Sequence, residues 1–390
     1  MLNTLCVIVW LIALIVIIPM VVVIIEVLAA MLLANRKVQH QNLMKPPKTV
    51  VLIPAHNEES VITDTLVSLN THLPENCSLL CVAHNCTDAT AKIASDFGAE
   101  VIEINDNATG GKPDAIKAGL QWLDSIQPEV VVIIDADCLV SPNTVSLLAN
   151  QVKQLGHPVM GAYFFAAAEQ GQQMSNLSSL AVMLKNFIRP LGLHKLGLPC
   201  LLNGSGSAYP FDVIRNSPHG EGSIAEDYQL SVDLLKKGYP TTFVPEAKLQ
   251  GQLPVDAGTA KKQRQRWEHG HLYLSFNTAP RLLLKGLLSF NKKTIALSLE
   301  LLVPPLAYLG LIWLLIATVS AFLSTTLLYI LLFIATLFFM VIFLSFCSFE
   351  GIGPTVTALA TLPDYVLWKI PIYRDFFIRR ETRWQKTERD

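Results

Sequence analysis

The sequence predicts an α/β domain with a parallel sheet, joined to α-helical transmembrane segments. Two patterns support this: strand and helix signals alternate from Thr49 to Gln154, and three separate apolar stretches are long enough to cross a bilayer. The composition agrees, since 51% of the 390 residues are hydrophobic and 16% are charged, which is too apolar for an ordinary soluble domain. The formal charge of −1 gives no global basic field, so nucleic acid is not an expected partner.

Each element of the α/β domain follows from an apolar run and its turn residues. Strands are expected at Thr49–Ile53, Leu79–Ala83, Glu100–Ile104 and Val130–Asp135, and helices at Ser60–Asn70, Thr87–Phe97, Lys112–Leu123 and Asn143–Gln154. This βαβα order implies a parallel sheet covered on both faces, with ligands beyond the C-terminal strand ends. After Pro158 the pattern is less regular, but helices are expected from Ile224 to Lys237 and, with an amphipathic pattern, over Lys261–Phe276. No Gly-x-Gly-x-x-Gly fingerprint is present, so a dinucleotide cofactor is not expected.

The apolar stretches are Leu5–Leu33, about Leu301–Leu323 and Thr326–Cys347, and a transmembrane helix needs roughly 20 residues. The first lacks a basic start and is too long for a signal peptide, so we interpret it as a retained anchor. Basic residues flank only one side of the spans: Arg36, Lys37, Lys45, Lys48, Lys285, Lys292, Lys293, Lys369, Arg374, Arg379, Arg380 and Arg383. The positive-inside rule then places the central domain and the C-terminal tail in the cytoplasm and the N terminus outside.

Three further features of the sequence are an acid within the first apolar stretch, a proline-containing segment and the cysteines. Glu26 would lie at the depth of the cytoplasmic interface, where its carboxylate can stay hydrated. The segment Gly351–Ile370 contains two prolines, which favours an interfacial helix and a re-entrant turn over a fourth span. The 7 cysteines show no paired CxxC spacing and are expected to be reduced thiols facing the cytosol.

Two carboxylates, Asp135 and Asp137, emerge where the apolar run Val130–Ile134 leaves the core. Alternate residues of an extended segment point the same way, so both can converge on one hard cation. Taken alone the pair is weak evidence, because acidic residues end many strands. Glu226 and Asp227 have an equally simple interpretation, since acidic residues suit a helix N-terminus.

Five motifs follow one another in the chain: Pro54-Ala55-His56-Asn57-Glu58, His84-Asn85-Cys86-Thr87-Asp88, Asp135-Ala136-Asp137, Glu226-Asp227 and Gln263-Arg264-Gln265-Arg266-Trp267. Together they resemble the membrane-bound glycosyltransferases of family 2, the group of cellulose, hyaluronan and poly-N-acetylglucosamine synthases. The resemblance covers roughly Thr49 to Phe276 with the flanking spans, and the Gln-x-x-Arg-Trp box is its most specific part. It implies a GT-A-like, Rossmann-like fold.

The resemblance also implies roles for individual residues. The nucleotide-sugar site would contain Ala55, His56, Asn57, Glu58, His84 and Asp135, and the acceptor and diphosphate site would contain Gly204, Ser205, Gln263, Arg264, Arg266 and Trp267. Asp135 and Asp137 would bind Mg²⁺ or Mn²⁺, and Asp227, with Glu226 beside it, would act as the catalytic base. Lys112 at a helix start can approach a phosphate, although a solvated surface lysine is an equally good interpretation.

The residue types suit glycosyl transfer independently. A guanidinium such as Arg266 donates two hydrogen bonds to a diphosphate, and Trp267 offers a flat face for a sugar ring, although Arg and Trp on this helix also suit a membrane surface. One departure is His84, which stands where the family usually has an Asp that pairs with the uracil N–H; a neutral imidazole can accept that hydrogen bond. His269 and His271 are expected on the helix surface or near the acceptor.

We therefore expect an inverting enzyme of the inner membrane, multi-pass, with a cytoplasmic catalytic domain. It would move a sugar from a nucleotide sugar, with a UDP-sugar as the first candidate, to a glycan or lipid-linked saccharide in exopolysaccharide or capsule biosynthesis. The expected segments are a membrane anchor (1–35), the GT-A domain (46–250), interfacial helices with the box (251–298), a transmembrane hairpin (299–348) and an interfacial segment with a basic tail (349–390).

The sequence leaves three alternatives open. A processive synthase would need channel walls from other copies or an export partner, because three spans supply few, whereas a single-addition enzyme needs no channel. A non-catalytic, transferase-like subunit that scaffolds or regulates polysaccharide synthesis or export is the alternative from another class. A nucleotidyltransferase could use the same metal acids but would not call for the Gln-x-x-Arg-Trp box.

Overall fold

The computed structural model describes residues 2–33, 46–106, 111–165, 173–218, 223–251 and 257–381. The chain forms two compact units, each assembled from separate segments. We call them the sheet unit (36–167, 199–267 and 382–390) and the helical unit (1–35, 168–198 and 268–381). Arg36, Lys37, Lys45 and Arg383, which entered the orientation argument, lie outside the described residues, and the five segment boundaries expected above stay a prediction.

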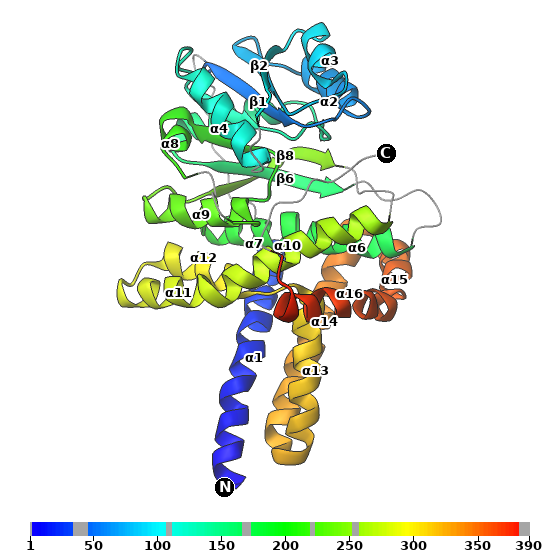
Figure 1. Cartoon of the computed structure of the whole chain (residues 1–390). Coiled ribbons are helices and arrows are strands. Elements are labelled where there is room, and N and C mark those ends of the chain that lie inside the picture. Colours follow the sequence, from blue (N-terminus) through cyan, green and yellow to red (C-terminus); the bar gives the residue numbers. More distant parts are fainter. Residues whose placement is uncertain are drawn as a thin grey trace. The chain divides into compact units, whose positions relative to one another are not determined.

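The sheet unit is built on one eight-stranded sheet of order β3-β2-β1-β4-β7-β6-β8-β5 (Figure 1). Its first half is parallel, as expected, and comprises β1 (Thr49–Ala55), β2 (Cys77–His84), β3 (Glu100–Ile104) and β4 (Val130–Ile133). Its second half is mixed, with antiparallel pairs β4–β7, β6–β7 and β5–β8 and a parallel pair β6–β8. The parallel sheet expected from the first four strands is confirmed for β1 to β4, and the pairing of the later strands was not predicted.

The strands of that second half are short or irregular, and none was expected from the sequence. They are β5 (Leu139–Val140), β6 (Val159–Phe165), β7 (Ser207–Pro210) and β8 (Thr242–Gly251). The order of the parallel strands reverses at β1, because β2 and β3 lie on one side of it and β4 on the other. Ligands of open α/β sheets bind at such a switch point, beyond the C-terminal strand ends.

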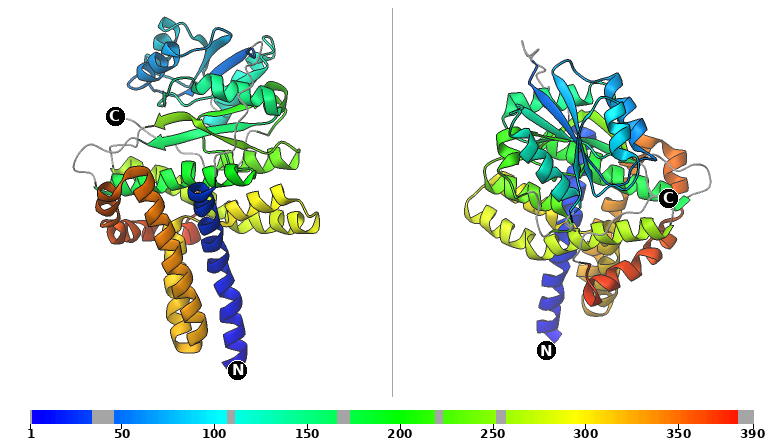
Figure 2. Two further views of the ribbon diagram at one scale, coloured as in Figure 1. Left: turned by 180° about the vertical axis from the view of Figure 1, so that it is seen from behind. Right: turned by 45° about the horizontal axis from the view of Figure 1, so that its top comes forward.

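Helices cover both faces of the parallel strands, which explains their uninterrupted apolar runs (Figure 2). Val51 and Ile53 point into a core shared with α2 (Ile62–Thr71), α3 (Thr90–Asp96) and α5 (Thr144–Leu155). Leu52 faces the opposite way, against α4 (Lys112–Leu123), where Gly119 leaves no room for a side chain. Two further helices, α8 (Phe211–Arg215) and α9 (Glu226–Lys236), belong to the same unit.

The expected elements agree with the structure apart from their ends. α4 and β3 have the expected bounds, whereas α2 and α3 begin two and three residues later than expected. Turns occupy the difference, because backbone and side-chain groups of Glu58, Glu59 and Asp88 bond across the two loops before the helices begin. β4 ends at Ile133 rather than Asp135, so both carboxylates of the Asp-x-Asp motif leave the ladder.

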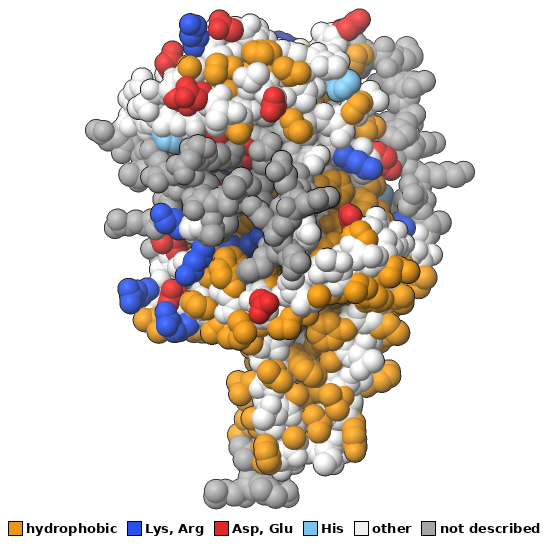
Figure 3. All heavy atoms as spheres, turned by 90° about the vertical axis from the view of Figure 1, so that its right-hand side faces the viewer, with side chains coloured by type: hydrophobic (Ala, Val, Ile, Leu, Met, Phe, Trp, Pro, Cys, Tyr) orange, Lys and Arg blue, Asp and Glu red, His pale blue; other side chains and the backbone are white. Residues whose placement is uncertain are grey.

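Among the described residues, three helices are candidate membrane spans, and all lie in the helical unit. They lie within α1 (Leu2–Leu32), α13 (Leu306–Leu323) and α14 (Thr325–Glu350), which confirms three expected helices long and apolar enough to cross a membrane and indicates membrane association. Figure 3 shows hydrophobic side chains along their visible face. The second span begins at Leu306 rather than Leu301, because Pro304 and Pro305 separate it from α12 (Lys292–Leu302).

The other helices of this unit are shorter. They are α6 (Gln173–Met183), the π-helix η1 (Leu184–Ile188), α7 (Arg189–Leu196), α11 (Ala279–Leu288), α15 (Ile352–Leu359) and α16 (Leu362–Ile378). Helix α10 (Ala257–Asn277) starts in the sheet unit and continues into the helical unit after Trp267. The segment Gly351–Ile370 forms two helices, and its position at a membrane interface stays a prediction.

Buried charges in the helical unit correct three expectations. Glu26 is 3% exposed and accepts a hydrogen bond from Arg189 Nε at 2.5 Å, so it is a buried ion-pair member and not a hydrated carboxylate. Lys369 forms a buried ion pair with Glu268, so its charge does not face water. His269 and His271 are also buried rather than on the surface, and burial lowers the pKa of His271 to about 3.

Candidate active site

Loops at the C-terminal ends of β1, β2 and β4 carry several of the predicted site residues of the sheet unit. Two of these loops turn at asparagines in the left-handed backbone region, Asn57 with φ 53° and Asn85 with φ 53°. Asn and Gly tolerate this region better than other residues, which allows a sharp exit from each strand. Asn57 Oδ1 accepts a hydrogen bond from Thr87 N at 2.8 Å, so the first two loops support one another.

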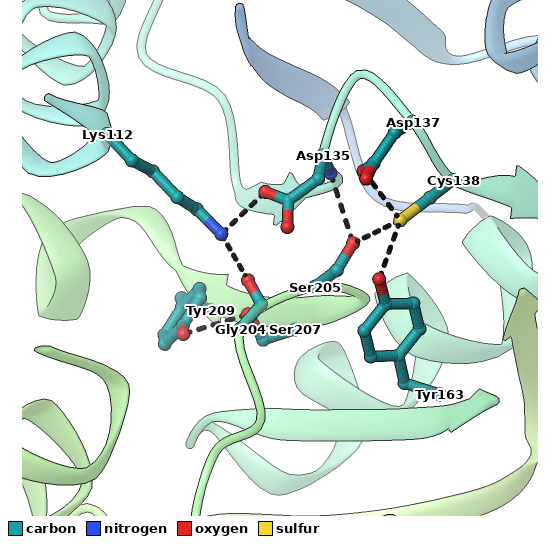
Figure 4. A network of polar contacts seen from close by, with 9 residues as sticks. All are labelled: Lys112, Asp135, Asp137, Cys138, Tyr163, Gly204, Ser205, Ser207 and Tyr209. Carbon is teal, nitrogen blue, oxygen red and sulfur yellow. Dashed lines mark hydrogen bonds and ion pairs between the residues drawn. The ribbon is translucent and has the colours of Figure 1, made fainter. Parts of the chain in front are cut away.

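The Asp-x-Asp loop lies beside Lys112 and the Gly204 loop (Figure 4). Lys112 Nζ lies 2.5 Å from Asp135 Oδ1 and donates to the Gly204 carbonyl at 2.7 Å. Asp135 N in turn donates to Ser205 Oγ at 3.0 Å. The structure therefore excludes the solvated-surface interpretation of Lys112 and brings together four residues from three separate regions of sequence.

Lys112 is the cationic centre of an acidic site. Burial alone would lower the pKa of its ammonium, but the carboxylates of Asp135, Asp227 and Glu226 outweigh that effect and raise it above the ordinary value. The ammonium is therefore charged at any physiological pH. It offsets part of the repulsion among carboxylates that would otherwise destabilise the site.

Glu226 and Asp227 form the first turn of α9. A Cβ atom at Gly204 would lie 3.1 Å from Asp227 Oδ2, and Gly204 has φ +93°, so a glycine is required both by backbone geometry and by the nearby carboxylate. Ser231 Oγ bridges the Asp227 carbonyl and Leu202 N, each at 2.8 Å, which fixes the Gly204 loop to α9. A small pocket next to these residues is lined by apolar side chains from α4, α8 and α9 and by both carboxylates.

Burial and the adjacent Asp227 carboxylate raise the pKa of Glu226 to about 7, although Arg266 partly offsets them. An acid whose pKa is raised in the folded state binds a proton that the unfolded chain releases. The folded state is thus favoured at low pH and loses stability as pH rises from 4.5 through about 7.

Glu226→Gln should therefore stabilise the protein at pH 8, by about 2 kcal/mol after allowance for its partial exposure. At pH 4, where most folded and most unfolded molecules carry a protonated carboxyl, the two proteins should melt alike. Thermal unfolding of the detergent-solubilised protein at both pH values tests this. Glu246→Gln, an exposed position of β8, is the matched control and should show no pH-dependent difference; equal melting of Glu226→Gln and wild type at pH 8 would contradict the expectation.

The expected base-binding residues lie at the ends of β1 and β2. Ala55 is buried in β1, and the Nδ1–H of His56 donates to the His84 carbonyl at 2.6 Å. His84 is 4% exposed, and its Nε2 lies 3.1 Å from Asp106 Oδ1. A carboxylate only accepts hydrogen bonds, so Nε2 carries a proton and faces Asp106. Glu58 N donates to Thr90 Oγ1 at 2.8 Å, which places Glu58 in the first loop.

Asp106 is a site residue that the sequence did not indicate. It follows β3, has no motif around it, and reaches His84 and Asn85 only because β3 pairs with β2. The Asp106 carboxylate, which follows the neighbouring strand β3, therefore lies beside His84, the residue that stands where the family usually has an Asp.

The Gln-x-x-Arg-Trp box lies in the first half of α10, where Gln263, Arg264, Arg266 and Trp267 are all partly buried. The Arg264 guanidinium lies 5.5 Å from the centre of the Trp267 ring, and Phe165 packs against the same indole at 6.1 Å. Arg266 is close enough to Glu226 to lower the pKa of that carboxyl. The box is thus joined to the acids of α9 and to the end of β6.

Three side chains suit a metal ion by position: Asp135, Asp137 and Cys138, whose ligand atoms all lie within 4.8 Å of one another. The two carboxylates are the oxygen donors that Mg²⁺ and Mn²⁺ prefer. The Cys138 thiol is a soft ligand, whereas Mg²⁺ and Mn²⁺ are hard cations that prefer oxygen. The donor set therefore fits a hard divalent cation held by Asp135 and Asp137.

A family model described as glycosyltransferase like family 2 matches residues 46–270, which is more than half of the chain. The chain belongs to this family. Its sheet has the GT-A arrangement that the resemblance implied.

Similar curated proteins are a probable glycosyltransferase, YdaM, of Bacillus subtilis, and glucomannan 4-β-mannosyltransferase 7 of Arabidopsis thaliana. The first is 26% identical over 60% of this chain and 57% of that protein, and the second 24% identical over 63% and 47%. The chain thus spans about half the length of these relatives. A mannosyltransferase from Pyrobaculum calidifontis, solved with GDP-Man and Mn²⁺, is 15% identical, with 91% of this chain and 99% of that chain covered and a TM-score of 0.47. None of these likenesses assigns a substrate.

Proposed function

We propose that this glycosyltransferase moves a sugar from a nucleotide sugar to a hydroxyl of a glycan or lipid-linked saccharide, with inversion at the anomeric carbon. A UDP-sugar is the first candidate donor. The observation that carries this proposal is the meeting of Asp135, Asp227 and Lys112 at the Gly204 loop, since it joins a metal-binding carboxylate, a base and a fixed positive charge.

Asp227 is the proposed general base. Its carboxylate lies at the start of α9 and against the open backbone of Gly204, where an acceptor hydroxyl can approach without meeting a side chain. As this hydroxyl attacks the anomeric carbon, its proton passes to the carboxylate. Attack from the face opposite the departing diphosphate inverts the configuration, so an α-linked donor yields a β-linked product.

The leaving diphosphate gains negative charge in the transition state. Arg266 would donate hydrogen bonds to it, and the Lys112 ammonium, held by Asp135, would add a second fixed positive charge. A divalent cation bound by Asp135 and Asp137 would supply Lewis-acid neutralisation of the same oxygens. Trp267 would receive the acceptor sugar on the part of its indole that Phe165 and Arg264 leave open.

The membrane spans support an acceptor that is carried or extended at a bilayer. We infer the orientation from the positive-inside rule: a cytoplasmic catalytic domain in a multi-pass protein of the inner membrane. Exopolysaccharide or capsule assembly is the pathway that such an enzyme would serve, and the name of the Arabidopsis relative, a mannosyltransferase, adds a nucleotide-activated mannose to the donors worth testing.

The test is transfer by the purified full-length protein in lipid nanodiscs with Mn²⁺. Radiolabelled UDP-glucose, UDP-N-acetylglucosamine and GDP-mannose would each be offered with oligosaccharide and polyprenyl-phosphate-linked acceptors. We expect one donor to give a β-linked product and Mn²⁺ removal to abolish it. Tight nucleotide binding without transfer to any acceptor would contradict the proposal and favour the scaffolding alternative.

Recognition of the nucleobase of the donor should depend on Asp106. Its carboxylate fixes the proton of His84 on Nε2, and charge-assisted hydrogen bonds of this kind contribute about 1.5–3 kcal/mol. We expect Asp106→Ala to weaken binding of UDP, measured by calorimetry with Mn²⁺ present, by about tenfold or more, because a change of 1.4 kcal/mol is about tenfold.

The control for this prediction is Asp96→Ala, an exposed carboxylate in α3. It should bind UDP as the wild type does. If Asp106→Ala binds UDP with wild-type affinity, the pair of His84 and Asp106 has no role in holding the nucleotide.

A further inference from the structure

Three buried side chains lie directly behind the carboxylate pair, and the mechanism above does not use them: Cys138, Tyr163 and Ser205. Figure 4 shows them as one network. Cys138 Sγ lies 3.5 Å from Asp137 Oδ1, 3.2 Å from Ser205 Oγ and 3.6 Å from the Tyr163 hydroxyl oxygen. Ser205 Oγ also accepts the hydrogen bond from Asp135 N. Buried side chains therefore hold both the Asp135 backbone and the Asp137 carboxylate in place.

These supporting groups are uncharged. Cys138 and Tyr163 are both buried, and a thiol and a phenol with ordinary pKa values keep their protons at neutral pH. A neutral thiol and a neutral hydroxyl can orient a carboxylate without competing with a cation for it. Their burial also rules out a role as nucleophiles.

Tyr163 continues the network toward the acceptor side. Tyr163 and Phe165 are two residues apart on β6 and share one face of the strand. Their ring centres lie 5.0 Å apart, and Phe165 lies 6.1 Å from Trp267. Aromatic contacts at such distances contribute about 0.5–1.5 kcal/mol beyond burial. Tyr163 thus contacts Cys138, which lies against the carboxylate pair, and it reaches the Trp267 indole through the Phe165 ring.

The backbone around Tyr163 is adapted to this placement. The pairing of β6 with β8 shifts register between Gly161 and Ala162, directly before Tyr163, and such irregularities re-aim side chains next to active sites. The Tyr163 hydroxyl occupies the space where a Cβ atom of Gly251 would be, so the hydroxyl is seated against bare backbone. Its position is therefore fixed by the sheet.

We propose that Tyr163 is a positioning residue that ties the carboxylate pair, through Cys138 and Ser205, to the acceptor-binding indole of Trp267, through Phe165. The inference rests on the proposed function, in which the acids bind a cation and the indole receives a sugar. It extends that function by assigning one residue to both halves of the site. The hydroxyl of Tyr163 helps to position the two carboxylates, and its ring helps to position the Trp267 indole.

Separate substitutions divide the two contributions. Tyr163→Phe keeps the ring and removes the hydroxyl, so the dissociation constant of Mn²⁺, measured by calorimetry with UDP, should rise about 3- to 10-fold, as for loss of one hydrogen bond, while the acceptor KM is unchanged. Phe165→Leu should raise the acceptor KM about fivefold and leave Mn²⁺ affinity unchanged. Tyr163→Leu should change both quantities.

Cys138→Ala should resemble Tyr163→Phe, and Cys81→Ala is its matched control, since Cys81 is an equally buried thiol in β2 within the hydrophobic core. Thermal melting shows which variants are folded. If Tyr163→Phe does not fold, the Mn²⁺ affinity of Cys138→Ala tests the inference in its place. Mn²⁺ affinities within twofold of wild type for both variants would overturn the inference. Failure of the wild type itself to bind Mn²⁺ would instead refute the proposed metal site, so the two failures are distinguishable.

Discussion

Asp227→Asn should lower kcat by about 10³-fold, because general base catalysis contributes about 10²–10⁴-fold and an amide cannot take the acceptor proton. The substitution is isosteric, so the Ser231 bridge from the Asp227 carbonyl to the Gly204 loop should persist. The donor KM should therefore change little. Initial rates of radiolabelled sugar transfer at saturating donor measure the effect.

Asp212→Asn is the control for this prediction, because Asp212 is an exposed carboxylate of α8 in the same unit. It should transfer sugar at the wild-type rate. If Asp227→Asn also retains that rate, the base is another group, and Glu226 would be the next carboxylate to examine.

Asp137→Asn should weaken metal binding and reduce transfer at limiting Mn²⁺ by about 10³-fold, since neutralisation of a leaving group by a metal ion is worth several kcal/mol. The remaining acid, Asp135, is already paired with Lys112 and holds the ion less tightly alone. Titration of Mn²⁺ in the presence of UDP should show at least tenfold weaker binding, equivalent to about 1.4 kcal/mol. Raised Mn²⁺ should restore part of the activity; an unchanged Mn²⁺ affinity would remove Asp137 from the metal site.

The parallel half of the sheet was predictable because its signals are local. β1, β2 and β4 are apolar runs buried on both faces, and α4 and α5 have regular amphipathic spacing. The antiparallel strands were not predictable in this way. β5 has two residues and β7 four, and each becomes a strand only through its partners β8 and β4.

The candidate site was predictable wherever chemistry coincided with a strand end or a helix start, as for Asp135, Asp137 and Asp227. It was not predictable where a residue acts through a distant partner. Cys138 follows the Asp-x-Asp motif directly, and this adjacency was the one signal available for it. Tyr163 and Asp106 gave none, because their roles depend on pairing between strands far apart in sequence.

Buried charges in the helical unit escaped prediction for a related reason. Charge counting treats every lysine near a span as facing water, yet Lys369 neutralises Glu268 in the interior. Spacing on α10 could not show that His269 donates from Nε2 to the Ile372 carbonyl at 2.8 Å and lies wholly inside. Both contacts join helices about a hundred positions apart in the chain.

The pair of Glu26 and Arg189 has a consequence for how the protein is made. The ribosome completes α1, with the Glu26 carboxylate, well before the guanidinium of Arg189 exists, since 163 positions separate the two residues. Gly192 of α7 then lets that helix touch the α1 backbone at Glu26, where any larger residue would collide. Helix α1 can thus complete its packing only after the segment around Arg189 has been translated, so the folding of α1 is coupled to that of this later stretch of chain.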